Sequence, residues 1–325
     1  MRKDRIGLIM KGMAMGIAEV IPGVSGGTIA FITGIYEQLI SSIKAFGPEA
    51  YNGYRSKGLK GFWEAINGDF LIMLLSGMAI GVILGIFGIS YLLENYPEPL
   101  WGFFFGLIAA SAIFIGRQIE NWNIKLAISF VIGVVFAYGI TILSPAEGST
   151  SPIYIFISGL LAISALMLPG ISGSFILLLL GMYTIIIPTI KNFLKTFDMA
   201  SLMIIAIFGS GCIVGLVGFS RILSWLFSKY KDISYALLTG FIIGALNKVW
   251  PWRNVSMILD KDSGERLEVL DVSNFSNLNS ESFKILQEVN CLPSDYMMGN
   301  PYTILTIFSI FAGFIAVFAL GRLQK

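Results

Sequence analysis

The chain has 325 residues, of which 55% are apolar and only 13% are charged, and its formal net charge is +2. Average soluble domains carry about 25% charged residues, so the composition excludes an ordinary soluble enzyme and indicates a polytopic membrane protein. The balanced charge offers no basic stripe for nucleic acid. There is no histidine, which removes histidine-based acid–base chemistry and most zinc sites. We therefore expect no catalytic residues, no metal and no cofactor.

Apolar stretches dominate the chain, and a bilayer crossing needs about 20 mainly apolar residues. Two regions, 6–43 and 152–190, each contain two short apolar arms joined by a Pro-Gly turn, and each is either a re-entrant hairpin or a tight pair of spans. Either way the chain returns to the side from which it came. Six further stretches are predicted to cross the membrane: 70–93, 100–116, 126–143, 202–220, 233–250 and 303–321.

Lys11 and Glu19 interrupt the first apolar run, so we expect the start of the chain to be retained rather than cleaved as a signal peptide. When both hairpins return to their starting side, most Lys and Arg residues fall on the side of the N-terminus. The positive-inside rule then predicts a multi-pass membrane protein with both termini in the cytoplasm.

An internal repeat divides the chain. Pro22-Gly23-Val24-Ser25-Gly26-Gly27 and Gly34-Ile35-Tyr36 return as Pro169-Gly170-Ile171-Ser172-Gly173-Ser174 and Gly181-Met182-Tyr183, at a constant offset of 147 positions. We predict a first membrane repeat over 1–148 and a second over 149–325. Each half is a helical hairpin plus three spans, and three is odd, so the halves have opposite orientations. The predicted fold is an all-α membrane protein with an inverted-topology repeat, an architecture of many secondary transporters.

Residues 251–300 form a polar insert in the second half, without a counterpart in the first. The predicted topology places it outside the cytoplasm. We expect a loop or small cap over 273–280 and a short helix over 281–289, and we interpret the insert as having no role in transport.

Each Pro-Gly turn has the residues of an anion site at a helix start. Pro22 and Gly23, like Pro169 and Gly170, are expected to form the turns. A serine then caps the following helix, whose first N–H groups carry partial positive charge and bind phosphate readily. The predicted substrate-binding residues of the turns are Ser25, Gly26, Gly27, Thr28, Ser172, Gly173 and Ser174.

Three charged residues in or beside apolar runs extend this hypothesis. Lys11 and Arg221 are candidate phosphate ligands, although snorkelling to the interface explains each of them as well. Glu19 lies near the C-terminal end of its helical arm, where a negative charge is disfavoured. We expect Glu19 to carry a proton in one transport state.

The run from Gly16 to Thr28, with its echo from Leu168 to Phe175, resembles a bacterial membrane family first catalogued as a domain of unknown function and now regarded as polyprenyl-phosphate transporters. The resemblance covers nearly the whole chain except the insert. It implies return of undecaprenyl phosphate from the outer to the cytoplasmic leaflet, which recycles the lipid carrier of peptidoglycan synthesis. It carries over the turn residues and Glu19, but not Lys11 or Arg221, and leaves the oligomeric state open.

Two alternatives remain open. A membrane lipid phosphatase would use the turn serines as part of a catalytic site, but only Glu19 lies close to them in sequence. A channel or carrier for a small inorganic anion would use the same turns as the lipid transporter does.

Overall fold

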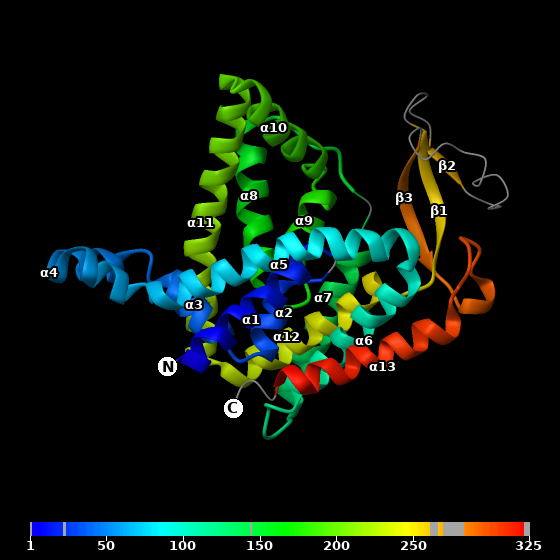
Figure 1. The fold of residues 1–325 in the computed structure, drawn as a ribbon, viewed down its shortest axis with the longest axis horizontal. Coiled ribbons are helices and arrows are strands. Elements are labelled where there is room, and N and C mark those ends of the chain that lie inside the picture. Colours follow the sequence, from blue (N-terminus) through cyan, green and yellow to red (C-terminus); the bar gives the residue numbers. More distant parts are fainter. Residues whose placement is uncertain (1, 22–23, 144, 261–265, 269–282, 322–325) are drawn as a thin grey trace.

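The computed structural model describes residues 2–21, 24–143, 145–260, 266–268 and 283–321 (Figure 1). The first half of the chain is helical. Its helices are α1 (Arg2–Glu19), α2 (Gly26–Ile32), α3 (Tyr36–Lys44), α4 (Pro48–Ala65), α5 (Gly68–Asn95), α6 (Pro97–Gly116) and α7 (Ile124–Ile142).

The second half follows the same order up to its insert, but it has no counterpart of α4. Its helices are α8 (Pro152–Met167), α9 (Gly173–Leu179), α10 (Tyr183–Thr196), α11 (Met199–Lys229), α12 (Lys231–Ala245) and, after the insert, α13 (Thr303–Gly321). A helix lies at each of the six predicted spans. Four helical stretches of the described chain are long and apolar enough to cross a membrane, and five if the bent pair α9–α10 counts as one.

Equivalent helices of the two halves pack in equivalent pairs. α1 packs along α5 as α8 packs along α11, and α6 packs along α13 as α12 packs along α7. Glycines permit the close approach: a side chain at Gly77 would collide with the backbone of Ile9, and one at Gly211 with that of Phe156. These two glycines therefore permit close helix packing.

Each hairpin region contains a second break that the sequence pattern did not predict. α2 ends just before Gly34 and α9 just before Gly181, and these glycines adopt φ angles of 72° and 67°. Glycine adopts such left-handed angles readily, whereas a side chain would be strained there. The chain turns sharply, so α9 and α10 are bent by 109° relative to each other. The repeated Gly-x-Tyr motif thus marks a second corner in each half.

The insert folds as a small antiparallel sheet beside the helices (Figure 1). It comprises η1, a short 3-10 helix (Leu246–Val249), then β1 (Arg253–Asp260), β2 (Arg266–Glu268), β3 (Phe283–Asn290) and η3 (Pro293–Asp295), with strand order β2-β1-β3. The predicted helix over 281–289 is wrong, because β3 occupies these positions from Phe283 onward. Pairing with β1 supplies its backbone hydrogen bonds. The loop predicted over 273–280 lies outside the described residues.

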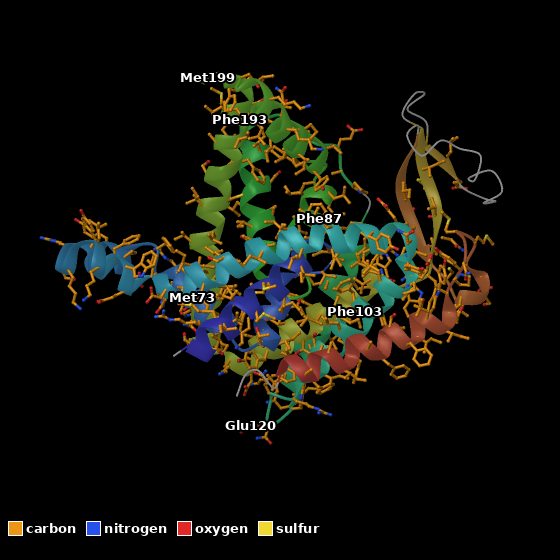
Figure 2. All side chains as sticks on the ribbon, viewed as in Figure 1. Met73, Phe87, Phe103, Glu120, Phe193 and Met199 are labelled. Atoms are coloured by element: carbon orange, nitrogen blue, oxygen red, sulfur yellow. The ribbon has the colours of Figure 1, made fainter. Side chains whose placement is uncertain are left out.

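Large apolar side chains cover the outer surface of the helices. Phe87 on α5 is 76% exposed, and Phe308 on α13 is 69% exposed (Figure 2 labels Phe87). Soluble monomers rarely expose contiguous apolar patches of more than a few hundred Å². Buried residues of α1, α2, α6, α8 and α12 form the core instead. The exposed apolar surface therefore suits contact with lipid.

Candidate functional site

The segment that follows the first predicted turn meets the second turn in the core of the protein. The backbone N–H of Gly170 donates to Thr28 Oγ1 at 3.0 Å, and Ser25 Oγ donates to the Leu168 carbonyl at 3.4 Å. Ser25 and Thr28 are each 1% exposed, and Ser172 is 4% exposed. Turns about 140 residues apart in sequence thus share one buried polar centre. Pro22 and Gly23, predicted to shape the first turn, lie outside the described residues.

Tyr36 supplies a third connection between the halves. Its hydroxyl donates to the Met167 carbonyl at 2.6 Å, directly before the second turn. The ring is buried and packs against Phe31 and Phe227, with ring centroids 5.0 and 5.6 Å away. Tyr36 is not among the site residues predicted from sequence, although its place in the repeated Gly-x-Tyr motif is a signal that points to it.

Charged residues of α1 cover both ends of α2. Glu19 Oε1 accepts from the backbone N–H of Gly26 at 2.7 Å, and Lys11 Nζ donates to the Thr33 carbonyl at 2.9 Å. The N-terminus of a helix carries partial positive charge and the C-terminus partial negative charge, so both contacts are favourable. Eight residues of α1 rise about 12 Å, which matches the short length of α2. Lys11 therefore lies at the far end of α2 from Ser25, and not at the turn.

The start of α2 is closed in this conformation. Ser25 Oγ accepts from the N–H of Gly27 at 3.1 Å as a helix cap. The N–H of Thr28 donates to the Ser25 carbonyl at 3.0 Å. Together with the Glu19 contact, these bonds use the first three N–H groups of the helix. An anion would bind there only after the Glu19 carboxylate moved away.

The second turn is more open than the first. Ser172 makes no capping bond to α9, and its hydroxyl instead shares a hydrogen bond of 2.8 Å with Ser174, which is exposed. Pro169 and Gly173 are buried. Gly170 has a φ angle of 85°, and an added Cβ there would lie 2.9 Å from the Ile242 backbone. The predicted turn at Pro169-Gly170 is therefore present and is held against α12.

An apolar groove lies beside the first turn. It has a volume of about 490 Å³, and its walls come from α1, α2, α5, α6 and α13. Val24 and Ile29 of the turn region line it together with Ala14, Leu107 and Phe104. The groove brings an apolar space next to the buried polar centre.

Arg221 does not join the turns. Its guanidinium packs against Gly47 at the junction of α3 and α4. With Lys44 and Glu49 it lines a separate cavity of about 420 Å³, whose wall includes Trp225. The sequence predicted Arg221 near the phosphate site, but the structure gives it a basic pocket of its own.

Apolar helices of crossing length and a polar centre built from interrupted helices define a multi-pass helical membrane protein. Comparison with known proteins gives the particular family. The sequence profile of the undecaprenyl phosphate translocase-like family matches residues 15–267, and the chain belongs to this family. The resemblance seen in the turn motifs is therefore confirmed.

Two curated relatives cover most of the chain. A polyprenyl-phosphate transporter of Vibrio cholerae is 44% identical over 277 residues, which are 85% of this chain and 86% of the relative. A polyprenyl-phosphate transporter of Staphylococcus aureus is 34% identical over 265 residues, which are 77% of this chain and 88% of the relative. No solved structure matches the chain significantly.

Proposed function

We propose that this protein moves undecaprenyl phosphate, or a similar polyprenyl phosphate, from the outer to the cytoplasmic leaflet of a bacterial cytoplasmic membrane. The names of the two relatives support this substrate. The observation that carries the proposal is the direct junction of two broken-helix turns beside an apolar groove. A phosphate monoester carries about −1.5 to −2 charges, and moving it through hydrocarbon without polar partners is costly.

The proposed architecture is an inverted repeat of residues 1–148 and 149–325, with both termini cytoplasmic. The equivalent packing pairs of the two halves support it. The start of α1 and Glu120 lie towards the lower edge of the view, whereas Met199 lies at the upper edge (Figures 1 and 2). The sheet of the insert also lies away from the lower edge. In this proposal the start of α1 and Glu120 lie on the cytoplasmic side, and Met199 and the sheet of the insert lie on the outer side.

Proton coupling is proposed at Glu19. The ionised carboxylate accepts a charge-assisted hydrogen bond from Gly26 and closes the start of α2. Protonation would weaken this bond and free the N–H group of Gly26 for the phosphate, while the Gly27 N–H remains bonded to Ser25 Oγ. Ser25, Thr28, Ser172, Gly173 and Ser174 complete the proposed headgroup site, whereas Lys11 stabilises α2 from its other end. Glu19 thus links the protonation state to access at the first turn.

The groove beside the first turn is the proposed place for the isoprenoid units next to the headgroup. Its lining is almost entirely apolar, and it borders Val24 and Ile29. The rest of the tail would remain in the bilayer. This arrangement distinguishes a lipid substrate from a small inorganic anion, which would gain nothing from an apolar groove.

Arg221 is proposed to act at the cytoplasmic end of the path. It shares its cavity with Lys44, and two cations there suit a phosphate that leaves the turns. Guanidinium and ammonium groups both bind phosphate, the former through two parallel hydrogen bonds.

Two measurements test the proposal. Purified protein in liposomes should move a labelled polyprenyl phosphate between leaflets, and cells without the protein should accumulate the lipid carrier in the outer leaflet. Release of inorganic phosphate from undecaprenyl diphosphate by the purified protein would instead establish the phosphatase. We expect none, since the relatives are named transporters.

A further inference from the structure

The insert forms one side of a cavity that reaches Phe175, one residue after the second turn motif. This vestibule has a volume of about 520 Å³ and lies between α7, the end of α9, η1 and β3. Tyr138, Phe175, Lys248, Gln287 and Asn290 contribute to its lining. The β3 residues 285 and 287–290 form one wall, so the vestibule exists only because the insert is present.

Lys248 connects the vestibule to the turn. A smaller cavity is lined by Gly170 and Ser172, and Lys248, Phe175 and Thr141 line both cavities. Lys248 Nζ lies 5.3 Å from the centre of the Phe175 ring, near the start of α9. The ammonium group therefore lies where the vestibule reaches the proposed headgroup site.

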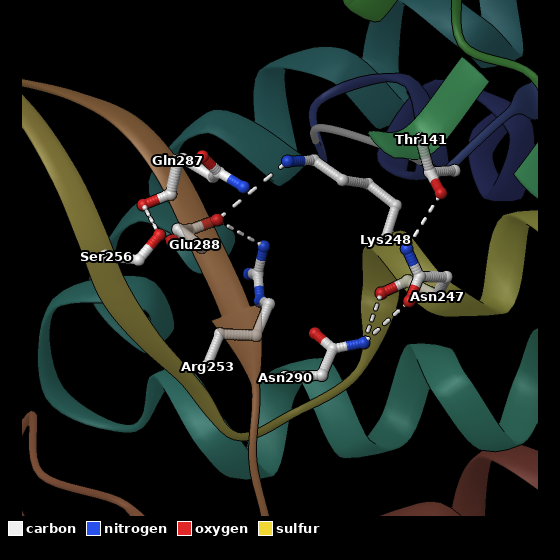
Figure 3. Close-up of polar contacts among 8 residues, drawn as sticks. All are labelled: Thr141, Asn247, Lys248, Arg253, Ser256, Gln287, Glu288 and Asn290. Atoms are coloured by element: carbon white, nitrogen blue, oxygen red, sulfur yellow. Dashed lines mark hydrogen bonds and ion pairs between the residues drawn. The ribbon is translucent and has the colours of Figure 1, made fainter. Parts of the chain in front are cut away.

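The Lys248 ammonium has a weak resident partner. Glu288 Oε2 on β3 lies 3.8 Å from Lys248 Nζ but only 2.7 Å from Arg253 Nη1 (Figure 3). The Arg253 guanidinium is also held 4.8 Å from the centre of the Trp101 ring. The carboxylate is thus bound mainly by Arg253, and two cations face one anion. Arg253 does not line the vestibule, but it neutralises most of the Glu288 charge, which leaves the Lys248 ammonium able to attract a further anion.

A chain of hydrogen bonds holds β3, which carries Glu288, next to η1, which carries Lys248. Asn290 Nδ2 on β3 donates to Asn247 Oδ1 at 2.8 Å, and Asn247 Nδ2 donates to Thr141 Oγ1 on α7 at 2.8 Å (Figure 3). This chain joins the sheet to η1 and to α7. It fixes the distance between the backbones that carry Lys248 and Glu288, while the long lysine side chain remains able to turn.

We propose that the vestibule is the loading site for the phosphate headgroup, where the Lys248 ammonium exchanges Glu288 for the phosphate monoester and leads it to Ser172. The inference rests on the proposed transport of a polyprenyl phosphate. In the unloaded state Glu288 shares its charge between Lys248 and Arg253. An arriving phosphate carries more negative charge than a carboxylate and therefore forms an ion pair with Lys248, while Glu288 remains paired with Arg253. The insert then takes part in transport, contrary to its interpretation from sequence.

The test measures flipping of a labelled polyprenyl phosphate in liposomes as a function of lipid concentration. Lys248→Gln should raise the half-saturating concentration about tenfold, because a charge-assisted bond to the phosphate is lost. Lys248→Arg should retain most of the wild-type affinity. Glu288→Gln should lower the half-saturating concentration, since the competing carboxylate is gone. Lys191→Gln, an exposed cation on α10 outside the vestibule, is the matched control and should change nothing.

The two Gln variants are expected to change the half-saturating concentration in opposite directions. This result would distinguish a loading site from an ion pair with a purely structural role. If the pair only held the sheet in place, both Gln variants would impair flipping in the same direction, and the proposal would be overturned. It would also be overturned if Lys248→Gln flipped lipid with wild-type half-saturation. Glu288→Gln and Lys248→Arg keep the test decisive if Lys248→Gln does not fold. Failure of the wild-type protein to flip lipid would instead refute the proposed function.

A second arm identifies the source of the phosphate. The wild-type protein is reconstituted into liposomes, and uptake of labelled inorganic phosphate is measured in place of lipid flipping. We expect no uptake. Uptake that Lys248→Gln abolishes would assign the vestibule to the free anion and reject the lipid headgroup.

Discussion

Thr28 and Gly170 join the two halves of this protein through a hydrogen bond of 3.0 Å between the Gly170 N–H and the Thr28 hydroxyl. The residues lie 142 positions apart. Neither group is accessible to water in this conformation, since Thr28 is 1% exposed and Gly170 is buried. Any movement of one half against the other changes the surroundings of this bond.

The hydroxyl of Thr28 should therefore matter for stability. Thr28→Val keeps the shape of the side chain but leaves the Gly170 N–H buried without an acceptor, which costs about 1–3 kcal/mol. We expect a lower midpoint of thermal unfolding in detergent. Thr28→Ser retains an acceptor and should be closer to wild type. Equal melting of the valine and wild-type proteins would show that the bond does not hold the halves together.

Glu19 should determine how transport depends on pH. Glu19→Gln can still accept from Gly26 through its amide oxygen but cannot exchange a proton. We expect the wild-type flipping rate to vary with pH and the Gln variant to give a flatter profile. Glu64→Gln is the control, because Glu64 is exposed on α4 and pairs with Lys57. Identical pH profiles for wild type and Glu19→Gln would reject proton coupling at this residue.

Gly170 should tolerate no side chain. Gly170→Ala would place a Cβ 2.9 Å from the Ile242 backbone at a φ angle of 85°, so both packing and backbone conformation oppose it. We expect loss of folded protein, measured as the monodisperse fraction in detergent. Gly209→Ala on α11, where an added Cβ meets nothing within 4 Å, should be neutral or stabilise by about 0.5–1 kcal/mol. Normal yield of folded Gly170→Ala protein would contradict the tight contact.

The apolar groove should be necessary for the lipid tail. Ala14→Phe would fill space beside the first turn, because Ala14 lines the groove. We expect flipping to fall about tenfold or more while thermal stability stays near wild type, since the groove has room for the ring. Ala206→Phe on the exposed face of α11 tests for a general effect of an added aromatic ring. Undiminished flipping by Ala14→Phe would exclude the groove as the place of the tail.

Local patterns in the sequence were sufficient for the membrane class, for a helix at each of the six predicted spans and for the turn at Pro169-Gly170. Each depends on properties of neighbouring residues, such as a long apolar run or a proline followed by glycine. The same patterns misjudged residues 281–289. A strand depends on a pairing partner, and the partner β1 begins 30 positions earlier, at Arg253.

The sequence by itself determined a helical membrane protein with two matching Pro-Gly turns. Only the tertiary structure decided what those turns contact. It places Lys11 at the far end of α2, lines a separate pocket with Arg221, and brings Tyr36 and Lys248 close to the second turn. The physical reason is that the function of a charged or hydroxyl side chain depends on which groups it contacts, and packing determines those contacts. Packing between segments more than 100 residues apart leaves no trace in local sequence.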